Sequence, residues 1–307
     1  DGRVSWDEFS DFVLAEAMQS HRIEKEEVSV FNPVEYDNQF NDPGAFHKDL
    51  ITAVVNVGAK NQYVSSSRDG SIRIWGSTTQ NHIHTIRISD KPTQTWITGI
   101  TIADGYKSAQ HPLGVLVSVA SDRVMRLYDM KNFALLGAVM LPDDVSPLCC
   151  SGFDRKDVLR RSKLTTAEYF IMVGDTDGKI LVYEQNEAFL SHKRERQALP
   201  GLENPLREKT AAVMTVTAHC DHVTQIGYVK GIDRIVSSSL DGKVCVLDPV
   251  TLDCNYFYGH SKPVLCTCYV STYSYFASSG QEREILLWSP YTQKRITSLV
   301  GHQAAVK

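Results

Sequence analysis

Serine, histidine and an acidic residue, the side chains of a hydrolytic triad, recur together along this chain. In the first set, His47 precedes Asp69 by 22 residues and Ser65 precedes the same acid by four. The same spacing returns in two further sets: His219, Ser237 and Asp241, then His260, Ser278 and Glu282. An enzyme needs one positioned nucleophile, whereas every copy of a structural repeat needs its own buried polar groups satisfied. Three copies at one spacing therefore favour a structural hydrogen-bond network and no catalytic residue.

A second chemical signal lies at the start of the chain, where DGRVSWDEF matches the second half of an EF-hand calcium loop. Asp1 and Glu8 would offer carboxylate oxygens, and Arg3 its backbone carbonyl. Apolar residues at helical spacing follow in FSDFVLAEAM. The first ligands of such a loop would precede residue 1. We therefore expect no cofactor in this chain alone, and calcium only where a longer parent protein completes the loop.

Two basic clusters form the third signal, and both lie in long segments that we interpret as inserted loops, residues 153–168 and 186–210. Their members are Arg155, Lys156, Arg160, Arg161 and Lys163, then Lys193, Arg194 and Arg196. Such charge runs are commonly solvated loops. The alternative is docking against an acidic surface such as the tails of tubulin.

The elements that must position the triad-like residues are five hairpins with one pattern. Each has a β-rich run, a turn with an acidic residue and a second alternating run, as in YVSSSRDGSIRIWG. The hairpins cover residues 63–76, 115–129, 169–184, 234–248 and 275–289. The second run reaches an aromatic or apolar residue six positions after the turn acid, which is Trp75 in the first hairpin and Trp288 in the fifth.

This pattern resembles the WD-repeat family, whose units carry Gly-His near one end and Trp-Asp near the other. Gly259-His260 gives the full dipeptide and Gly301-His302 opens a further unit, whereas the second and third units lack the histidine. The resemblance implies an all-β fold, an incomplete β-propeller of at least five antiparallel four-stranded blades after a short α-helical EF-hand remnant. In that family the acid, histidine, serine and tryptophan form one hydrogen-bond chain. We expect an EF-hand-like segment over 1–22, a linker with a possible strand over 23–45 and blades over 46–307.

Composition sets outer limits on function. The chain has 307 residues, a formal net charge of −4, 42% hydrophobic residues and 22% charged residues. These values are typical of a globular protein and exclude a strongly basic nucleic-acid binder. No apolar run approaches the ~20 residues that span a bilayer. Seven cysteines without paired clusters favour free thiols in the cytoplasm. We expect neither nucleic-acid nor membrane partners.

The order of the modules suggests a function through the same resemblance. An EF-hand-like segment running into WD repeats is similar to EF-hand WD-repeat proteins of motile cilia and flagella. The resemblance implies a non-enzymatic scaffold of the axonemal cytoskeleton, with partners among the proteins of a large assembly, tubulin and dynein-regulating components. Two alternatives remain open, a calcium-dependent signalling adaptor and a ubiquitin-ligase substrate receptor. The receptor would present Trp-Asp-x-Arg, and the nearest match is Tyr128-Asp129-Met130-Lys131.

Overall fold

The computed structural model describes residues 46–57, 60–88, 95–103, 114–154, 169–185, 208–209, 212–249, 251, 253–292 and 294–307. The chain divides into two compact units at Phe46 and His47, and the second unit is described here. The predicted EF-hand segment over 1–22 and the linker over 23–45 lie outside the described residues, so the domain boundaries remain predictions.

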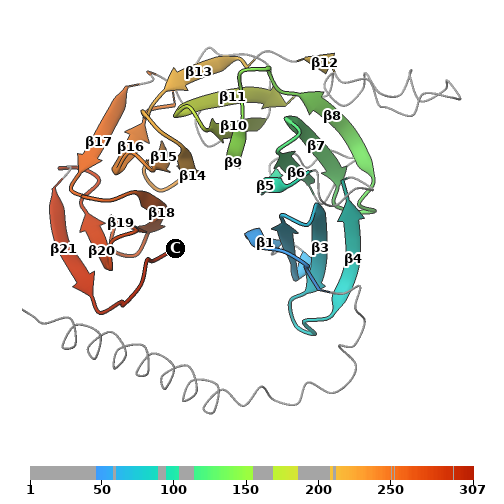
Figure 1. The fold of residues 1–307 in the computed structure, drawn as a ribbon, viewed down its shortest axis with the longest axis horizontal. Coiled ribbons are helices and arrows are strands. Elements are labelled where there is room, and N and C mark those ends of the chain that lie inside the picture. The colour runs from blue at the N-terminus through green and yellow to red at the C-terminus, as the bar shows by residue number, and fades with distance from the viewer. Residues whose placement is uncertain are drawn as a thin grey trace, which may run out of the picture. The chain divides into compact units, whose positions relative to one another are not determined.

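The described part folds into five sheets that we number blades one to five in chain order (Figure 1). Blade one contains β1 (Ile51–Val57), β2 (Gln62–Ser67), β3 (Ser71–Gly76) and β4 (His82–Arg87). Blade two contains β5 (Ile97–Ala103), β6 (Val115–Ala120), β7 (Val124–Asp129) and β8 (Leu135–Met140). Blade three contains β9 (Pro147–Asp154), β10 (Tyr169–Asp175), β11 (Lys179–Gln185) and β13 (Met214–Thr217).

The last two blades repeat this arrangement. Blade four contains β14 (Val223–Val229), β15 (Arg234–Ser239), β16 (Lys243–Leu247) and β17 (Cys254–Tyr258). Blade five contains β18 (Val264–Val270), β19 (Tyr275–Gly280), β20 (Glu284–Trp288) and β21 (Arg295–Val300). In every blade these four strands pair antiparallel in chain order, from an inner strand to an outer one. The predicted all-β fold with antiparallel four-stranded blades is confirmed.

The central hairpin of each blade turns at the acidic residue that the sequence pattern identified. In three of these turns a glycine follows the acid with a positive φ: Gly70 at 74°, Gly178 at 78° and Gly242 at 79°. Glycine adopts this conformation without steric cost, so the Asp-Gly pair fixes a tight turn. In blade two Arg123 takes the same position with φ 60°.

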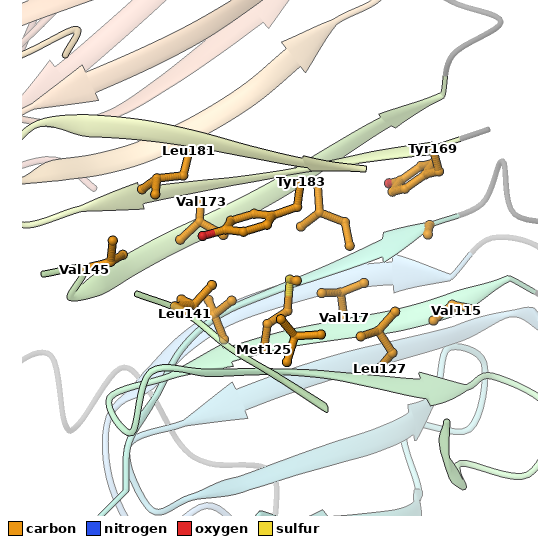
Figure 2. Close-up of a cluster of buried hydrophobic side chains, with 14 residues drawn as sticks. Val115, Val117, Met125, Leu127, Leu141, Val145, Tyr169, Val173, Leu181 and Tyr183 are labelled. Atoms are coloured by element: carbon orange, nitrogen blue, oxygen red, sulfur yellow. The ribbon is translucent and has the colours of Figure 1, made fainter. Parts of the chain in front are cut away.

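Four apolar clusters hold the blades to one another, one cluster between each neighbouring pair. The largest joins blades two and three, where Val117 and Met125 face Val173 and Tyr183 (Figure 2). These residues alternate along their strands with positions on the opposite face, which serve the next interface. Blades two, three and four are therefore buried on both apolar faces, because each packs between two neighbours.

The first and last blades of the series show what happens without a neighbour. Val54 on β1 is 61% exposed, whereas Ile100, at the same register position in blade two, is 4% exposed. Leu299 on β21 is 50% exposed, whereas its counterpart Phe257 in blade four is 1% exposed. No sheet of the described residues covers these two faces, which accounts for their exposed apolar side chains.

One strand was not expected from the sequence. Within the segment interpreted as an inserted loop, β12 (Glu208–Lys209) pairs in parallel with the outer strand β8 of blade two. Blade two therefore has a fifth, short strand at its outer edge. No helix in the part of the chain that the structure describes has the length and hydropathy to cross a membrane.

Candidate functional site

Blade five contains a complete copy of the triad-like set, together with its tryptophan. Trp288 Nε1 donates to Ser278 Oγ over 2.7 Å, and the same oxygen lies 2.7 Å from His260 Nε2. His260 Nδ1 lies 2.7 Å from Glu282 Oε2. Because a carboxylate only accepts, Nδ1 carries the proton, and Nε2 accepts from the serine hydroxyl. The backbone amide of Ser261 also donates to this carboxylate, over 2.5 Å. The chain of bonds ties the turn between β19 and β20 to the loop before β18.

The glycine before this histidine makes room for the tryptophan ring. A Cβ at Gly259 would lie 2.4 Å from a ring carbon of Trp288. Blade four has Ala218 at the position before its histidine and the smaller Leu247 in place of tryptophan. In blade five the glycine is thus a steric requirement of the adjacent tryptophan ring, whereas blade one combines Trp75 with Phe46 before its histidine.

Blade one has the same chain of bonds with aspartate as its acid. Trp75 Nε1 donates to Ser65 Oγ over 2.8 Å, and His47 Nε2 lies 2.7 Å from that oxygen. His47 Nδ1 lies 3.3 Å from Asp69 Oδ2, which also accepts the backbone amide of Lys48 over 2.8 Å. This carboxylate therefore joins the hairpin turn to the loop before β1.

Blade four keeps three of the four members. His219 Nε2 lies 2.8 Å from Ser237 Oγ, and His219 Nδ1 lies 3.2 Å from Asp241 Oδ2. The tryptophan position is occupied by Leu247, which is fully buried and donates nothing. The structure thus brings together every member of the three predicted sets.

Burial and hydrogen bonding set the protonation of these groups. Burial lowers the pKa of His47 and of His219, although each carboxylate partner partly opposes the shift. Burial alone would raise the pKa of Asp69, but hydrogen bonds from Ser71 and the Lys48 amide outweigh it and lower the pKa to about 2. At neutral pH the blade-one network therefore consists of a neutral His47 imidazole and an ionised Asp69 carboxylate.

Access decides what this chemistry can do. Ser65, Ser237 and Ser278 are 3%, 1% and 1% exposed, and they point into the sheet packing. In blades one and five an indole N–H also occupies the serine oxygen. A serine nucleophile must reach a substrate carbonyl beside donors that stabilise an oxyanion. These serines instead serve as hydrogen-bond junctions inside the blades.

In blade two an arginine on β7, and not a histidine, contacts the turn acid. Asp122, its turn acid, receives Arg126 Nη1 over 3.2 Å and Nη2 over 2.5 Å, and the arginine is largely buried. The buried hydroxyl of Ser118 has no hydrogen-bond partner within the described residues. Sequence reasoning missed Arg126, although a charged residue inside the apolar run VMRLYD was a usable signal.

Blade three uses another substitute, again missed from sequence. Asp175, fully buried, accepts the backbone amides of Asp177 and Lys179 at Oδ1 over 3.0 and 2.7 Å. Burial raises the pKa of Asp175, and its Oδ2 has no partner in the described part of the chain. The buried hydroxyl of Tyr183 is also without a partner there. Apolar packing against blade two holds this blade in place (Figure 2).

The remaining predicted site residues cannot be placed. The calcium-loop residues Asp1, Arg3 and Glu8 lie outside the described residues. The same holds for both basic clusters, Arg155, Lys156, Arg160, Arg161, Lys163, Lys193, Arg194 and Arg196. Within the described ranges, no group of His, Cys, Asp and Glu side chains is arranged to hold a metal ion.

Comparison with known families agrees with this geometry. The family described as WD domain, G-beta repeat (WD40) matches residues 45–76 and 252–289. These two segments hold the hairpins of blades one and five, the two blades with a complete histidine, serine, acid and tryptophan chain. The chain therefore contains WD40 repeats, and its five antiparallel four-stranded sheets are built as in a WD40 propeller.

Proposed function

We propose that this protein is a non-enzymatic interaction scaffold of the motile cilium or flagellum, where it binds neighbouring proteins of the axoneme. WD40 repeats suggest a protein-interaction scaffold. The observation that carries the non-enzymatic part is the burial of all three serines inside repeated networks. The axonemal setting rests on the similarity of the module order to EF-hand WD-repeat proteins of cilia.

The exposed loops of the blades support a role in binding. In every blade, the residue before the turn acid donates its backbone N–H to the carbonyl of the residue before the inner strand, over 2.8–3.2 Å. The five pairs are Arg68 with Leu50, Ser121 with Trp96, Thr176 with Ser146, Leu240 with His222, and Gln281 with Pro263. The fold fixes the backbone here while the side chains differ in charge, size and polarity. Such positions can take up contacts with different partners without disturbing the blade.

Two experiments test the two halves of the proposal. A tagged full-length protein is expressed in ciliated cells and imaged, and cross-linking in isolated axonemes identifies its neighbours. We expect localisation along the axoneme and cross-links to axonemal proteins. Exclusion of the protein from the axoneme contradicts the ciliary role.

The non-enzymatic part is tested with a fluorophosphonate probe, which labels activated serines. We expect no labelling of the purified protein, because the serine hydroxyls are buried and engaged. Labelling that disappears in Ser65→Ala, Ser237→Ala or Ser278→Ala would overturn the structural interpretation of the networks.

A further inference from the structure

We infer that Leu50, Arg68 and Trp96 form a docking site for an acidic peptide segment of a partner protein, a segment that carries a large apolar side chain beside its carboxylates. The inference rests on the proposed function and deepens it. It names one place on the scaffold and the chemistry of what binds there.

The three residues are joined by the fold. The Arg68 amide donates to the Leu50 carbonyl over 2.9 Å, which fixes the blade-one turn against the loop before β1. The Arg68 guanidinium lies over the Trp96 ring at 5.6 Å from the ring centroid. The backbone amide of Trp96 donates to Ser121 Oγ over 2.9 Å. The site therefore lies on the blade-one turn and on the residues just before the inner strands β1 and β5, where hydrogen bonds hold the backbone.

Trp96 is exposed for a reason different from that of the end faces. Blade two packs between blades one and three, so its apolar faces are covered. Trp96 nevertheless stays 48% exposed, and its sequence neighbours Thr95 and Ile97 are buried. Leu50 is exposed at the corresponding position of blade one. Because an exposed tryptophan and leucine gain little from the fold, their apolar surface is available for a partner side chain.

The unused polar groups define the charge of the partner. The indole N–H groups of Trp75 and Trp288 donate to serines, but Trp96 Nε1 donates to nothing within the described ranges. Neither Arg68 nor the exposed Lys48 forms an ion pair with a described residue. The nearby carboxylates are engaged: Asp69 in its network, and Asp49 with the Leu50 amide over 2.6 Å. Free donors and two free cations call for acceptors with negative charge.

The same groups favour a peptide over a nucleic acid. Trp96 and Arg68 could stack on a base. A phosphate chain, however, needs a run of cations, and this site offers two together with the carboxylate of Asp49, on a chain of net charge −4. One or two carboxylates beside an apolar side chain match the site better.

The test uses the purified 307-residue chain and three fluorescein-labelled probes measured by anisotropy. The probes are a peptide of alternating Glu and Phe, the matching peptide of Lys and Phe, and an oligo-dT of similar length. We expect the Glu–Phe peptide to bind, with affinity falling as salt is raised. Trp96→Ala and Arg68→Glu should each weaken binding about tenfold or more.

Matched controls lie in blade five. Tyr291→Ala removes another exposed aromatic side chain, and Arg295→Glu makes the same charge change on an exposed arginine. Both should leave binding unchanged. The inference is overturned if the Glu–Phe peptide does not bind, if the Lys–Phe peptide or oligo-dT binds as tightly, or if the controls weaken binding equally.

Failure of this site is distinguishable from failure of the scaffold. If axonemal cross-links persist in the wild-type protein but the Glu–Phe peptide does not bind, only the docking site is wrong. If the protein has no cross-linked neighbours at all, the proposed function fails regardless of the peptide result.

Discussion

The hydroxyl of Ser278 is the junction of the blade-five network, and its removal gives the sharpest test of a structural role. Ser278 Oγ accepts the Trp288 indole N–H and lies within hydrogen-bond distance of His260 Nε2, both at 2.7 Å. Ser278→Ala leaves these two groups buried without partners, because all three side chains are almost fully buried. Each unsatisfied buried group costs about 1–3 kcal/mol. We therefore expect a loss of about 2–5 kcal/mol in the free energy of unfolding.

Blade two provides a matched control for this substitution. Ser118 occupies the same hairpin position and is equally buried, but its hydroxyl has no hydrogen-bond partner in the described part of the chain. Ser118→Ala removes a hydroxyl of the same size that serves neither an imidazole nor an indole N–H. We expect a change within about 0.5 kcal/mol, or a small gain in stability.

The assay is urea unfolding followed by circular dichroism and by tryptophan fluorescence. In addition, the indole N–H resonance of Trp288 should exchange with solvent faster in Ser278→Ala than in the wild type. Equal stability losses for the two variants, or an unchanged exchange rate at Trp288, would refute the idea that the serine holds the network together.

Three further predictions concern the other parts of the networks. Acid should destabilise the fold between about pH 7 and pH 5. His47 and His219 have lower pKa values in the folded state than in the unfolded state, so the unfolded state takes up protons first as the pH falls. The double variant His47→Asn, His219→Asn should flatten this part of a plot of the free energy of unfolding against pH. Gly259→Ala should cost about 1–3 kcal/mol, since the new Cβ meets an indole ring at 2.4 Å, whereas Gly227→Ala, with open space at its Cβ, should be neutral or slightly stabilising in urea unfolding. Arg126→Met should cost about 1–3 kcal/mol by thermal or urea unfolding, because it leaves the largely buried turn carboxylate of blade two without its cation; an unchanged midpoint would show that the pair contributes nothing.

The fold could be predicted from the sequence because the turn and strand patterns are local and repeated. The Asp-Gly turns and alternating strands sit at fixed offsets, so five hairpins could be aligned without any knowledge of their packing. His260 and Ser278 are 18 residues apart, yet their contact could be predicted because the same spacing recurs in three units. A repeat turns a long-range contact into a pattern along the chain.

The substitutes in blades two and three could not be read in this way. Asp175 occurs once, at a position where the other blades have different residues, so no repetition marks it. Arg126 shares its position with Arg73 of blade one, but blade one also has its histidine, so an arginine there does not by itself indicate a replacement. Their roles depend on burial and on which backbone amides come within reach, as with the amide of Lys179 beside Asp175. β12 likewise could not be predicted from the sequence. A two-residue strand has no alternating pattern, and it forms because this segment lies beside β8.

By itself, the sequence determined the repeated hairpin, the number of recognisable blades and the sets of residues that belong together, because these follow from local turn chemistry and period-two alternation. Only the tertiary structure decided which polar groups are satisfied and which side chains remain exposed. Trp96 illustrates the difference. Residue type alone does not distinguish it from Trp288, yet Trp96 lies exposed beside an arginine and Trp288 lies deep within its blade. Burial depends on what packs around a residue, and that is set by contacts between blades.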